Sequence, residues 1–534
     1  MSSWLTVISD FKGLVRALVG LRSRHMVAKT LHRDRATINR WLDGAQPSSG
    51  DDVARLIKAA LENRVDISPY QSFSPIYDFS PMLTYEQKLQ TGPPDLSWLT
   101  AVPLPPAIPT KLCGLETDCP LGLASSPIVS DDRWTGAMLD LGFGLSTFKT
   151  RRPTPKDSWD PPQIAFVLQP PDVLQYDPNK PPEVLVTCKW EEAKLSPVLN
   201  LVNSIGVPSE APPEWQQVYE RIKRQPRGRF VGISVMGEGE MTGSVVRDFA
   251  EAVARAKEVH PPFVELNSSC PNLEKKTGDV FDDPDLMAEI CMSARDVLKG
   301  TGILLSLKLP LLAEAKLRST LEKVGHSVDI IASRNTIRVC PMVVDRDGDR
   351  HAAFPGRRFG GLSGPCTFET TLKSIRDIDR ARKDLGQEFG IIAIGGVASA
   401  SDVVELLNAG ANVVQACTAP MFDPLLAWKI RFHLKHSGIT LHRPQDECVP
   451  LLPRDRIELD SWRNLHAAAR EIRNKTGHDV PHLLACEKWN NWANSRSNPR
   501  PADAYRFSGA RGVADWIREL TPRSPVRRPN RQAG

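Results

Sequence analysis

The sequence predicts an α/β protein whose main part is a (β/α)8 TIM barrel, with a small N-terminal helical domain and a C-terminal extension. Three observations support this fold class. The middle of the chain alternates short apolar segments with amphipathic helical segments. Eight apolar segments occur, which is the number of strands in such a barrel. Polar residues stand at the ends of nearly all of them, where barrel enzymes carry their chemistry.

The eight segments are predicted as strands because each is short, apolar and followed in most cases by a helical pattern. Continuous apolar strands indicate burial on both faces, and alternating helices indicate a parallel sheet. The strands are predicted at 121–126, 144–149, 230–235, 263–269, 303–309, 329–336, 391–396 and 413–419. Clear helical patterns lie at 245–259, 284–299 and 400–410. A doubly wound sheet uses the same alternation and stays open as the alternative.

Composition divides the chain into four regions. Residues 1–64 alternate apolar and basic residues at helical spacing and are predicted as a helix-turn-helix-like domain. Residues 65–110 are rich in proline and are predicted as a linker, because proline breaks helices and cannot donate in a sheet. The barrel is predicted over 111–435. Residues 436–534 form a C-terminal extension that ends in a basic tail.

Composition also limits the functional class. The 534 residues are 41% hydrophobic and carry a net charge of +5, so the chain can bury a core, and its overall charge is no argument for nucleic-acid binding. The ten scattered cysteines contain no CxxC pair, so no metal site is predicted and reduced thiols in the cytoplasm are expected. No apolar run approaches the roughly 18 residues of a membrane span, and no signal peptide is evident, so no membrane partner is expected.

Several strand-end residues have a chemical use. Gly395 and Gly396 open a helix, where bare N–H groups can hold a phosphate. Lys149 and Lys308 end apolar strands, where a lysine is costly unless an anion pairs with it. Cys270 lies in a loop beside polar groups, where a thiolate can act as a general base, although a lone cysteine is more often an inert apolar residue. Asparagine offers a planar ligand both a donor and an acceptor. Four such side chains are Asn203, Asn267, Asn272 and Asn335.

Together these motifs resemble the dihydroorotate dehydrogenase family. VELNSSCPN (264–272) resembles its substrate and base loop, and NSIGV (203–207) resembles its orotate-binding loop. LSLKLP (305–310), FGGLSG (359–364) and IAIGGVASASDVVELLNAGANVVQ (392–415) follow in family order. Shorter matches are LASS (123–126), FKT (148–150), RNT (334–336) and ACTA (416–419). The resemblance covers about 111–435.

The resemblance implies a barrel that holds FMN and oxidises (S)-dihydroorotate to orotate in pyrimidine biosynthesis. Cys270 would take the proton from C5, and hydride would pass from C6 to flavin N5. A cysteine base is typical of the cytosolic class, and a homodimer is expected. The implied catalytic residues are Cys270, Lys308 and Lys149.

The implied ligand contacts form two overlapping sets. The FMN contacts are Ala124, Ser125, Lys149, Thr150, Asn267, Lys308, Gly364, Gly395, Gly396, Cys417 and Thr418. The contacts to the small dihydropyrimidine substrate are Lys149, Asn203, Ser204, Ile205, Gly206, Val207, Asn267, Asn272, Asn335 and Thr336.

The chain departs from the family pattern at several positions. Ser126 and Cys417 stand where glycine is usual, and Arg334 replaces an apolar residue, so its side chain needs a partner. The spacing from Lys149 to Asn203 is 203 − 149 = 54 residues, longer than is typical, with a Pro-rich insert near the substrate. Oxidation or reduction of another dihydropyrimidine therefore stays open as an alternative.

Residues 25–44 resemble a helix-turn-helix of the phage-repressor type. Ala28, Ile38 and Trp41 fall at the buried positions of that motif, and His32 occupies the turn position where left-handed φ favours glycine. The residues expected to face DNA are Arg33, Arg35, Thr37, Asn39 and Arg40. A plain helical bundle with a solvated basic face is the alternative, and such folds also serve as protein adaptors. A DNA-binding regulator that senses a pyrimidine or a flavin is therefore a second hypothesis for the whole chain.

Overall fold

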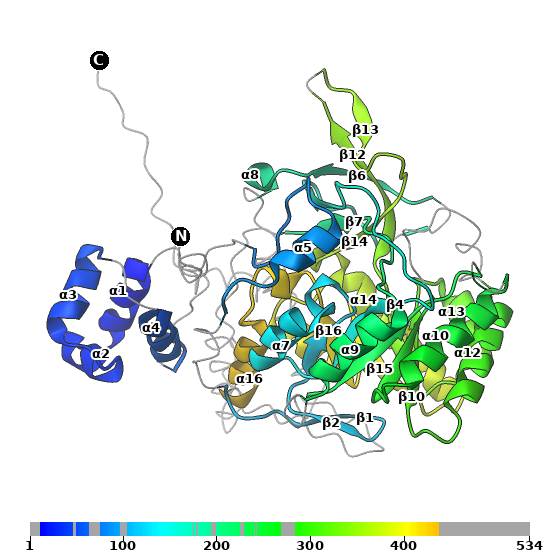
Figure 1. Ribbon diagram of the computed structural model, residues 1–534. Coiled ribbons are helices and arrows are strands. Elements are labelled where there is room, and N and C mark those ends of the chain that lie inside the picture. Colours follow the sequence, from blue (N-terminus) through cyan, green and yellow to red (C-terminus); the bar gives the residue numbers. More distant parts are fainter. Residues whose placement is uncertain are drawn as a thin grey trace, which may run out of the picture.

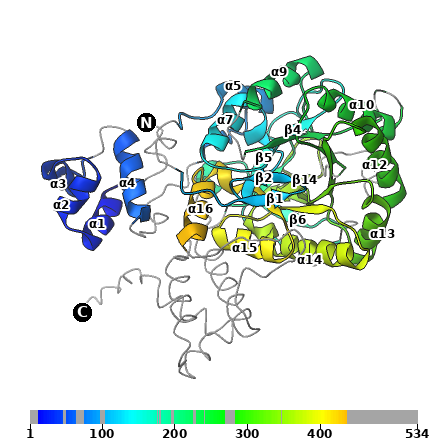
Figure 2. The same ribbon diagram turned by 90° about the horizontal axis from the view of Figure 1, so that it is seen from below.

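A ring of parallel strands forms the centre of the molecule, and helices surround it (Figures 1 and 2). This computed structural model describes residues 11–45, 50–62, 75–96, 104–174, 176–177, 180–193, 199–224, 229–239, 241, 243–268, 283–345 and 347–436. The predicted C-terminal extension lies outside the described residues, apart from its first residue.

The barrel strands pair in parallel in the order expected of a (β/α)8 barrel. They are β3 (Leu121–Leu123), β4 (Ser146–Arg151), β8 (Val231–Val235), β9 (Phe263–Asn267), β10 (Leu304–Leu309), β11 (Ile330–Ser333), β15 (Gly390–Ile394) and β16 (Val413–Ala416). The ring closes between β3 and β4, where the Leu123 N–H donates to Ser146 Oγ at 3.1 Å and the Gly144 N–H to the Leu121 carbonyl at 2.8 Å. The predicted TIM barrel is therefore confirmed, and each strand overlaps a predicted segment.

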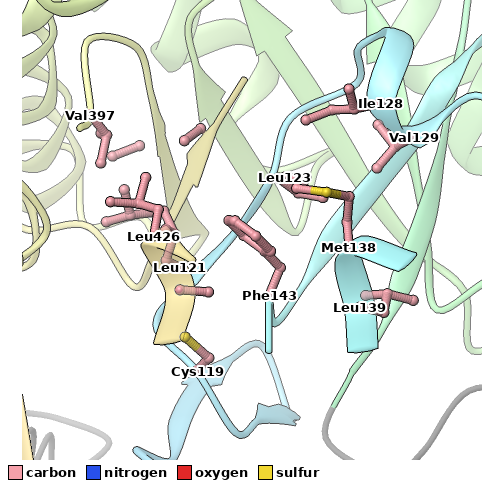
Figure 3. Close-up of a cluster of buried hydrophobic side chains, with 14 of the residues drawn as sticks. Cys119, Leu121, Leu123, Ile128, Val129, Met138, Leu139, Phe143, Val397 and Leu426 are labelled. Carbon is pink, nitrogen blue, oxygen red and sulfur yellow. The ribbon is translucent and has the colours of Figure 1, made fainter. Parts of the chain in front are cut away.

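Amphipathic helices cover the outside of the ring (Figure 2). They are α7 (Asp132–Asp140), α9 (Pro212–Ile222), α10 (Val245–Lys257), α12 (Pro284–Leu298), α13 (Glu314–Val324), α14 (Phe368–Asp384), α15 (Ala400–Asn408) and α16 (Leu426–His436). Their apolar faces pack on the strands. Figure 3 shows one such contact, where Leu123 of β3 lies beside Phe143 and Met138, all fully buried.

A second sheet lies over one end of the barrel (Figure 1). Its strands are ordered β13-β12-β14-β7-β5-β6, and β12 also pairs with β6. They are β5 (Ile164–Val167), β6 (Glu183–Thr187), β7 (Leu201–Asn203), β12 (Ile337–Val344), β13 (Arg350–Ala352) and β14 (Gly360–Ser363). The Pro-rich insert after β4 supplies β5 and β6, so it is a structured roof. At the opposite end lies the hairpin of β1 (Thr110–Leu112) and β2 (Leu115–Thr117).

Four one-turn elements complete the barrel and its roof. They are η3 (Pro127–Val129), α8 (Trp190–Ala193), η4 (Pro365–Thr367) and η5 (Ala419–Met421).

Part of the predicted linker packs against the barrel. The segment 75–96 contains α5 (Tyr85–Thr91), and Tyr77 and Tyr85 are both buried. The Ile76 N–H donates to the Met421 carbonyl at 2.7 Å, which fastens the segment to the turn after β16. Apolar and aromatic residues between the prolines therefore override the loop prediction here.

Four helices form a separate group before the barrel: α1 (Phe11–Leu21), α2 (Arg24–Thr30), α3 (Arg35–Asp43) and α4 (Gly50–Glu62) (Figure 1). Ala28, Ile38 and Trp41 are buried in its core, as expected. His32 adopts φ +53° in the turn before α3, the left-handed conformation predicted at that position. No helix of the described residues is long and apolar enough to cross a membrane.

Candidate active site

A cavity lies between the barrel and the roof sheet. Residues at or just after the carboxyl ends of seven barrel strands line it, and β5, β7 and β14 of the roof close it from above. Parallel strands bring their carboxyl ends to one edge, so residues far apart in the sequence meet here.

Most of the predicted site residues line this one cavity. All the expected FMN contacts do so: Ala124, Ser125, Lys149, Thr150, Asn267, Lys308, Gly364, Gly395, Gly396, Cys417 and Thr418. Of the expected substrate contacts, Asn203, Ile205, Gly206, Val207, Asn335 and Thr336 join Lys149 and Asn267 there. Cys270 and Asn272 lie outside the described residues. What these side chains bind stays a prediction.

Ser204 is the exception among the described residues. It is fully buried behind the cavity wall, where its N–H donates to the Gln163 carbonyl at 2.7 Å and its carbonyl accepts from Arg357 at 2.5 Å. Arg357 also donates to the carbonyls of Asp160 and Pro162, each at 2.8 Å. Ser204 therefore ties the loop 203–207 to the insert.

Amide and hydroxyl groups form a chain across three strands of the cavity floor. Asn335 Nδ2 donates to Asn267 Oδ1 at 2.9 Å, and Asn267 Nδ2 donates to Thr150 Oγ1 at 3.0 Å. The Thr150 hydroxyl also lies 3.0 Å from that of Ser234. Each bond fixes the rotation of the next amide, so the donors and acceptors that face the cavity have set positions.

The two lysines of the cavity have different surroundings. Lys308 Nζ lies 2.8 Å from Glu265 Oε1, and both side chains are buried inside the barrel. The anion expected beside Lys308 is therefore the carboxylate of Glu265, on the neighbouring strand. Lys149 Nζ lies 5.9 Å from the centre of the Tyr85 ring, a distance typical of cation–π contacts. Burial raises the pKa of Tyr85 to about 12, so the phenol stays neutral.

The two positions where glycine is usual face each other. Ser126 and Cys417 both line the cavity, and the nearby Ser126 hydroxyl together with the charges of Lys308 and Lys149 favours the Cys417 thiolate. Burial outweighs these effects and raises the pKa of Cys417 to about 11. Cys417 is therefore a neutral thiol near pH 7.

A set of glycine turns lies at another part of the cavity. Gly364, Gly395 and Gly396 have φ of +110°, +123° and +74°, conformations that other residues rarely adopt. A Cβ on Gly396 would stand 2.4 Å from the Phe368 backbone nitrogen, so the turn after β15 packs directly on the first turn of α14. Bare backbone therefore faces the cavity here.

Arg334 reaches the same place from the end of β11. Its Nη2 donates to the Thr367 carbonyl at 2.8 Å and to Thr371 Oγ1 at 2.9 Å. Arg334 stands where an apolar residue is usual and was expected to need partners, and these two acceptors are such partners. Burial lowers the pKa of Arg334 to about 10, which leaves it charged at neutral pH.

Two residues that pack against the cavity lining had no clear signal in the sequence. Tyr85 comes from the region predicted as a linker, and Trp159 comes from the insert. The backbone N–H of Trp159 donates to the Ile205 carbonyl at 3.0 Å. A Cβ on Gly206 would stand 2.9 Å from the Trp159 indole ring. Glycine at 206 is therefore needed for close approach of the insert. The only sequence signal was the unusual length of chain between Lys149 and Asn203.

The residues expected to face DNA fall into two groups. Arg35, Asn39 and Arg40 are exposed on α3, and Arg40 Nη2 donates to Thr37 Oγ1 at 2.8 Å. Arg33 instead lies 2.6 Å from buried Asp52 of α4, so its guanidinium holds the helical group together. Within the described residues no cluster of side chains could hold a metal ion.

Comparison with known proteins points to one family. A family model described as dihydroorotate dehydrogenase matches residues 193–437. The chain is 23% identical over 366 residues to a dihydroorotate dehydrogenase of Dictyostelium discoideum, covering 66% of this chain and 96% of that protein. It is 27% identical over 325 residues to a dihydroorotate dehydrogenase (quinone) of Mesorhizobium japonicum, covering 60% and 78% respectively.

Further similarity supports the same family and fold. A dihydroorotate dehydrogenase B (NAD(+)) catalytic subunit of Halalkalibacterium halodurans is 30% identical over 200 residues, covering 37% of this chain and 61% of that protein. A solved structure of DHODH from Eimeria tenella in complex with ferulenol matches with a TM-score of 0.51 and 18% identity, covering 70% of this chain and 98% of that one. That structure supports the fold alone.

Proposed function

The chain belongs to the dihydroorotate dehydrogenase family and is an oxidoreductase acting on a CH–CH group, and we propose that it oxidises (S)-dihydroorotate to orotate with FMN in pyrimidine biosynthesis. The observation that carries the proposal is the content of the cavity. Two lysines, three asparagines and a set of glycine turns reach it from separate strands. This combination provides cations for anionic groups, paired donors and acceptors for a pyrimidine, and bare backbone for a phosphate.

The residues of the cavity fit FMN. Gly364, Gly395 and Gly396 form a cradle that a Cβ would fill, and Arg334 adds a buried positive charge beside it. Lys308 lies on another strand, where its ammonium suits the electron-rich edge of a flavin. When bound, FMN supplies the acceptor for the hydride that leaves C6 of the substrate.

The remaining polar groups suit the substrate. Asn203, Asn267 and Asn335 present amides to the cavity, and the hydrogen bonds between them fix two of these amides in orientation. A cyclic imide has alternating donors and acceptors in one plane, which amides can match in pairs. Lys149 offers positive charge for the substrate carboxylate.

We assign the proton transfer at C5 to Cys270 on the resemblance alone. Cys270 follows β9 by three residues and lies outside the described residues. The start of its loop is anchored, because Ser268 Oγ donates to the Lys308 carbonyl at 2.8 Å. A thiol in this loop becomes a base only when its thiolate is stabilised, and neighbouring cations provide that stabilisation.

The visible spectrum of the purified protein tests the proposal. A yellow protein whose flavin bleaches on anaerobic addition of dihydroorotate is expected, and Cys270→Ala should slow the bleaching about 100-fold or more. A colourless protein that takes up no FMN would overturn the proposal. A yellow protein that only another dihydropyrimidine bleaches would support the alternative substrate. Fumarate, a quinone and NAD⁺ are the acceptors to compare in turnover.

DNA binding remains a second proposal, favoured by the exposed Arg35 and Arg40 on α3, which follows the turn at His32. Orotate-dependent, salt-sensitive binding to DNA is the expected result for a sensing regulator. Absence of any mobility shift with random DNA at low salt would remove it. The homodimer and the cytoplasmic location stay predictions.

A further inference from the structure

We propose that Arg334 is the charge partner of the flavin phosphate and makes this chain selective for FMN over riboflavin. The inference rests on the proposed function, because it needs a flavin in the cavity. It adds a side chain to a site that glycine turns and a helix terminus otherwise form from backbone alone.

The first argument is that Arg334 is buried without a counter-ion. Its side chain is 3% exposed, and its guanidinium donates only to neutral acceptors: the carbonyls of Thr367 and Asn335 and the hydroxyl of Thr371. Its Nε has no hydrogen-bond partner. No carboxylate pairs with it in the part of the chain that the structure describes. A buried cation of this kind is costly unless an anion joins it.

The second argument is where the guanidinium lies. A Cβ on Gly395 would stand 3.5 Å from Arg334 Nη2, so the cation borders the glycine turn after β15. The next residue, Gly396, packs against the Phe368 nitrogen in the first turn of the 17-residue helix α14. The positive end of a helix dipole, bare backbone and a buried arginine thus converge at one edge of the cavity. A phosphate monoester is the anion that suits all three.

The third argument is the contrast with the other cations of the cavity. Lys308 is neutralised by Glu265, and Lys149 lies against the ring of Tyr85. Those lysines come from β10 and β4, whereas Arg334 ends β11 beside the turns after β15. Glu265 therefore balances the charge of Lys308, whereas no carboxylate among the described residues balances the charge of Arg334 at the glycine turns. The forked guanidinium also matches phosphate oxygens better than an ammonium does.

The test compares two flavins that differ only in the phosphate. Flavin is removed from the full-length protein, and the Kd of FMN and of riboflavin is measured by fluorescence quenching. Arg334→Met should weaken FMN binding about 10- to 100-fold and change riboflavin binding less than about 3-fold. Arg334→Lys, which keeps the charge, should give a smaller loss that is again confined to FMN. Arg380→Met is the matched control, because Arg380 is an exposed arginine on α14. This variant should change neither the FMN affinity nor the riboflavin affinity.

Each other result has a definite meaning. Equal weakening of both flavins, or no change in either, would overturn the inference and leave the proposed function intact. Failure of the unaltered protein to bind either flavin would overturn both. If Arg334→Met does not fold, the Arg334→Lys variant and competition by phosphate test the inference instead. Inorganic phosphate should compete with FMN for the unaltered protein and leave riboflavin binding unchanged. Binding of phosphate and FMN at the same time would assign the anion site to a different phosphorylated ligand and overturn the inference.

Discussion

Lys308 and Glu265 form a buried ion pair in the barrel, and removing one partner leaves the other charge without compensation. Glu265 is fully buried, and its Oε2 has no hydrogen-bond partner even when Lys308 is present. Lys308→Met should therefore lower the free energy of unfolding by about 3–5 kcal/mol. Urea unfolding of the flavin-free protein near pH 7 measures this loss apart from any effect on cofactor binding.

The double variant Lys308→Met/Glu265→Gln is the control. It removes both charges, so it should recover most of the lost stability. If the single and double variants were equally unstable, loss of packing rather than an unpaired charge would explain the effect.

Lys88 is a buried lysine whose removal should stabilise the fold, which is the opposite of the effect expected at Lys308. It is 2% exposed on α5, and burial lowers its pKa to about 8 although Asp78 partly offsets this. The unfolded chain holds this proton up to its ordinary pKa near 10.4, so the folded state bears a cost while the lysine is charged. Lys88→Met should raise the free energy of unfolding at pH 7 by about 2 kcal/mol.

The pH dependence separates this explanation from a gain in packing. The advantage of Lys88→Met should shrink as pH rises from about 8 to 10.4, because the folded protein no longer carries the charge while the unfolded chain still does. Urea unfolding at pH 7 and pH 10 measures this stability advantage. Lys111→Met, at an exposed lysine, is the control. An advantage that stays constant with pH would contradict the assignment.

At the scale of elements, the junction of β15 with α14 is held by a glycine that no other residue can replace. Gly396→Ala puts a Cβ 2.4 Å from the Phe368 nitrogen at φ +74°, so both the backbone conformation and the contact are strained. We expect a loss of about 2–4 kcal/mol in unfolding free energy. Gly348→Ala, at φ +89° with open space around it, should cost only about 1 kcal/mol. Equal losses in the two variants would show that the close contact between β15 and α14 does not matter.

The sequence predicted the elements that obey a local rule. The barrel strands are continuous apolar runs followed by polar residues, and Gly395 and Gly396 mark the turn that opens the next helix, so pattern alone located them. Tyr85 and Trp159 were missed because each packs against the cavity lining from a Pro-rich segment whose local pattern indicates only a loop. Their placement depends on long-range packing, with Tyr85 against Lys149 and Trp159 against Gly206.

At the scale of the whole molecule, the cavity is assembled from three parts of the chain. The barrel contributes strand ends, the insert contributes β5 to the roof, and residues 75–96 pack behind Lys149. A barrel alone has an open carboxyl face, and here the roof covers it, so we expect the roof to influence which substrate reaches the amides. Because Trp159 of the insert contacts the loop 203–207, a change at Trp159 should alter substrate preference more than flavin affinity.

Stability of the whole protein should fall in alkaline solution. Burial raises the pKa of Cys417 to about 11 and those of Cys291 and Cys366 to about 12. Unfolded thiols ionise near pH 8.5, so between about pH 9 and 11 the folded state holds protons that the unfolded chain has lost. The free energy of unfolding then decreases with rising pH, by about 1 kcal/mol per pH unit for each thiol.

Urea unfolding under reducing conditions at pH 8, 9.5 and 10.5 measures this decrease. Lys88 acts in the opposite direction over part of this range, so the informative quantity is the difference between the natural chain and the triple variant Cys291→Ala/Cys366→Ala/Cys417→Ala. The variant starts from a lower stability because it creates small cavities, but it should lose less of that stability as pH rises. Parallel pH profiles for the two proteins would mean that these buried thiols ionise as easily as exposed ones, and would contradict their enclosure in the folded core.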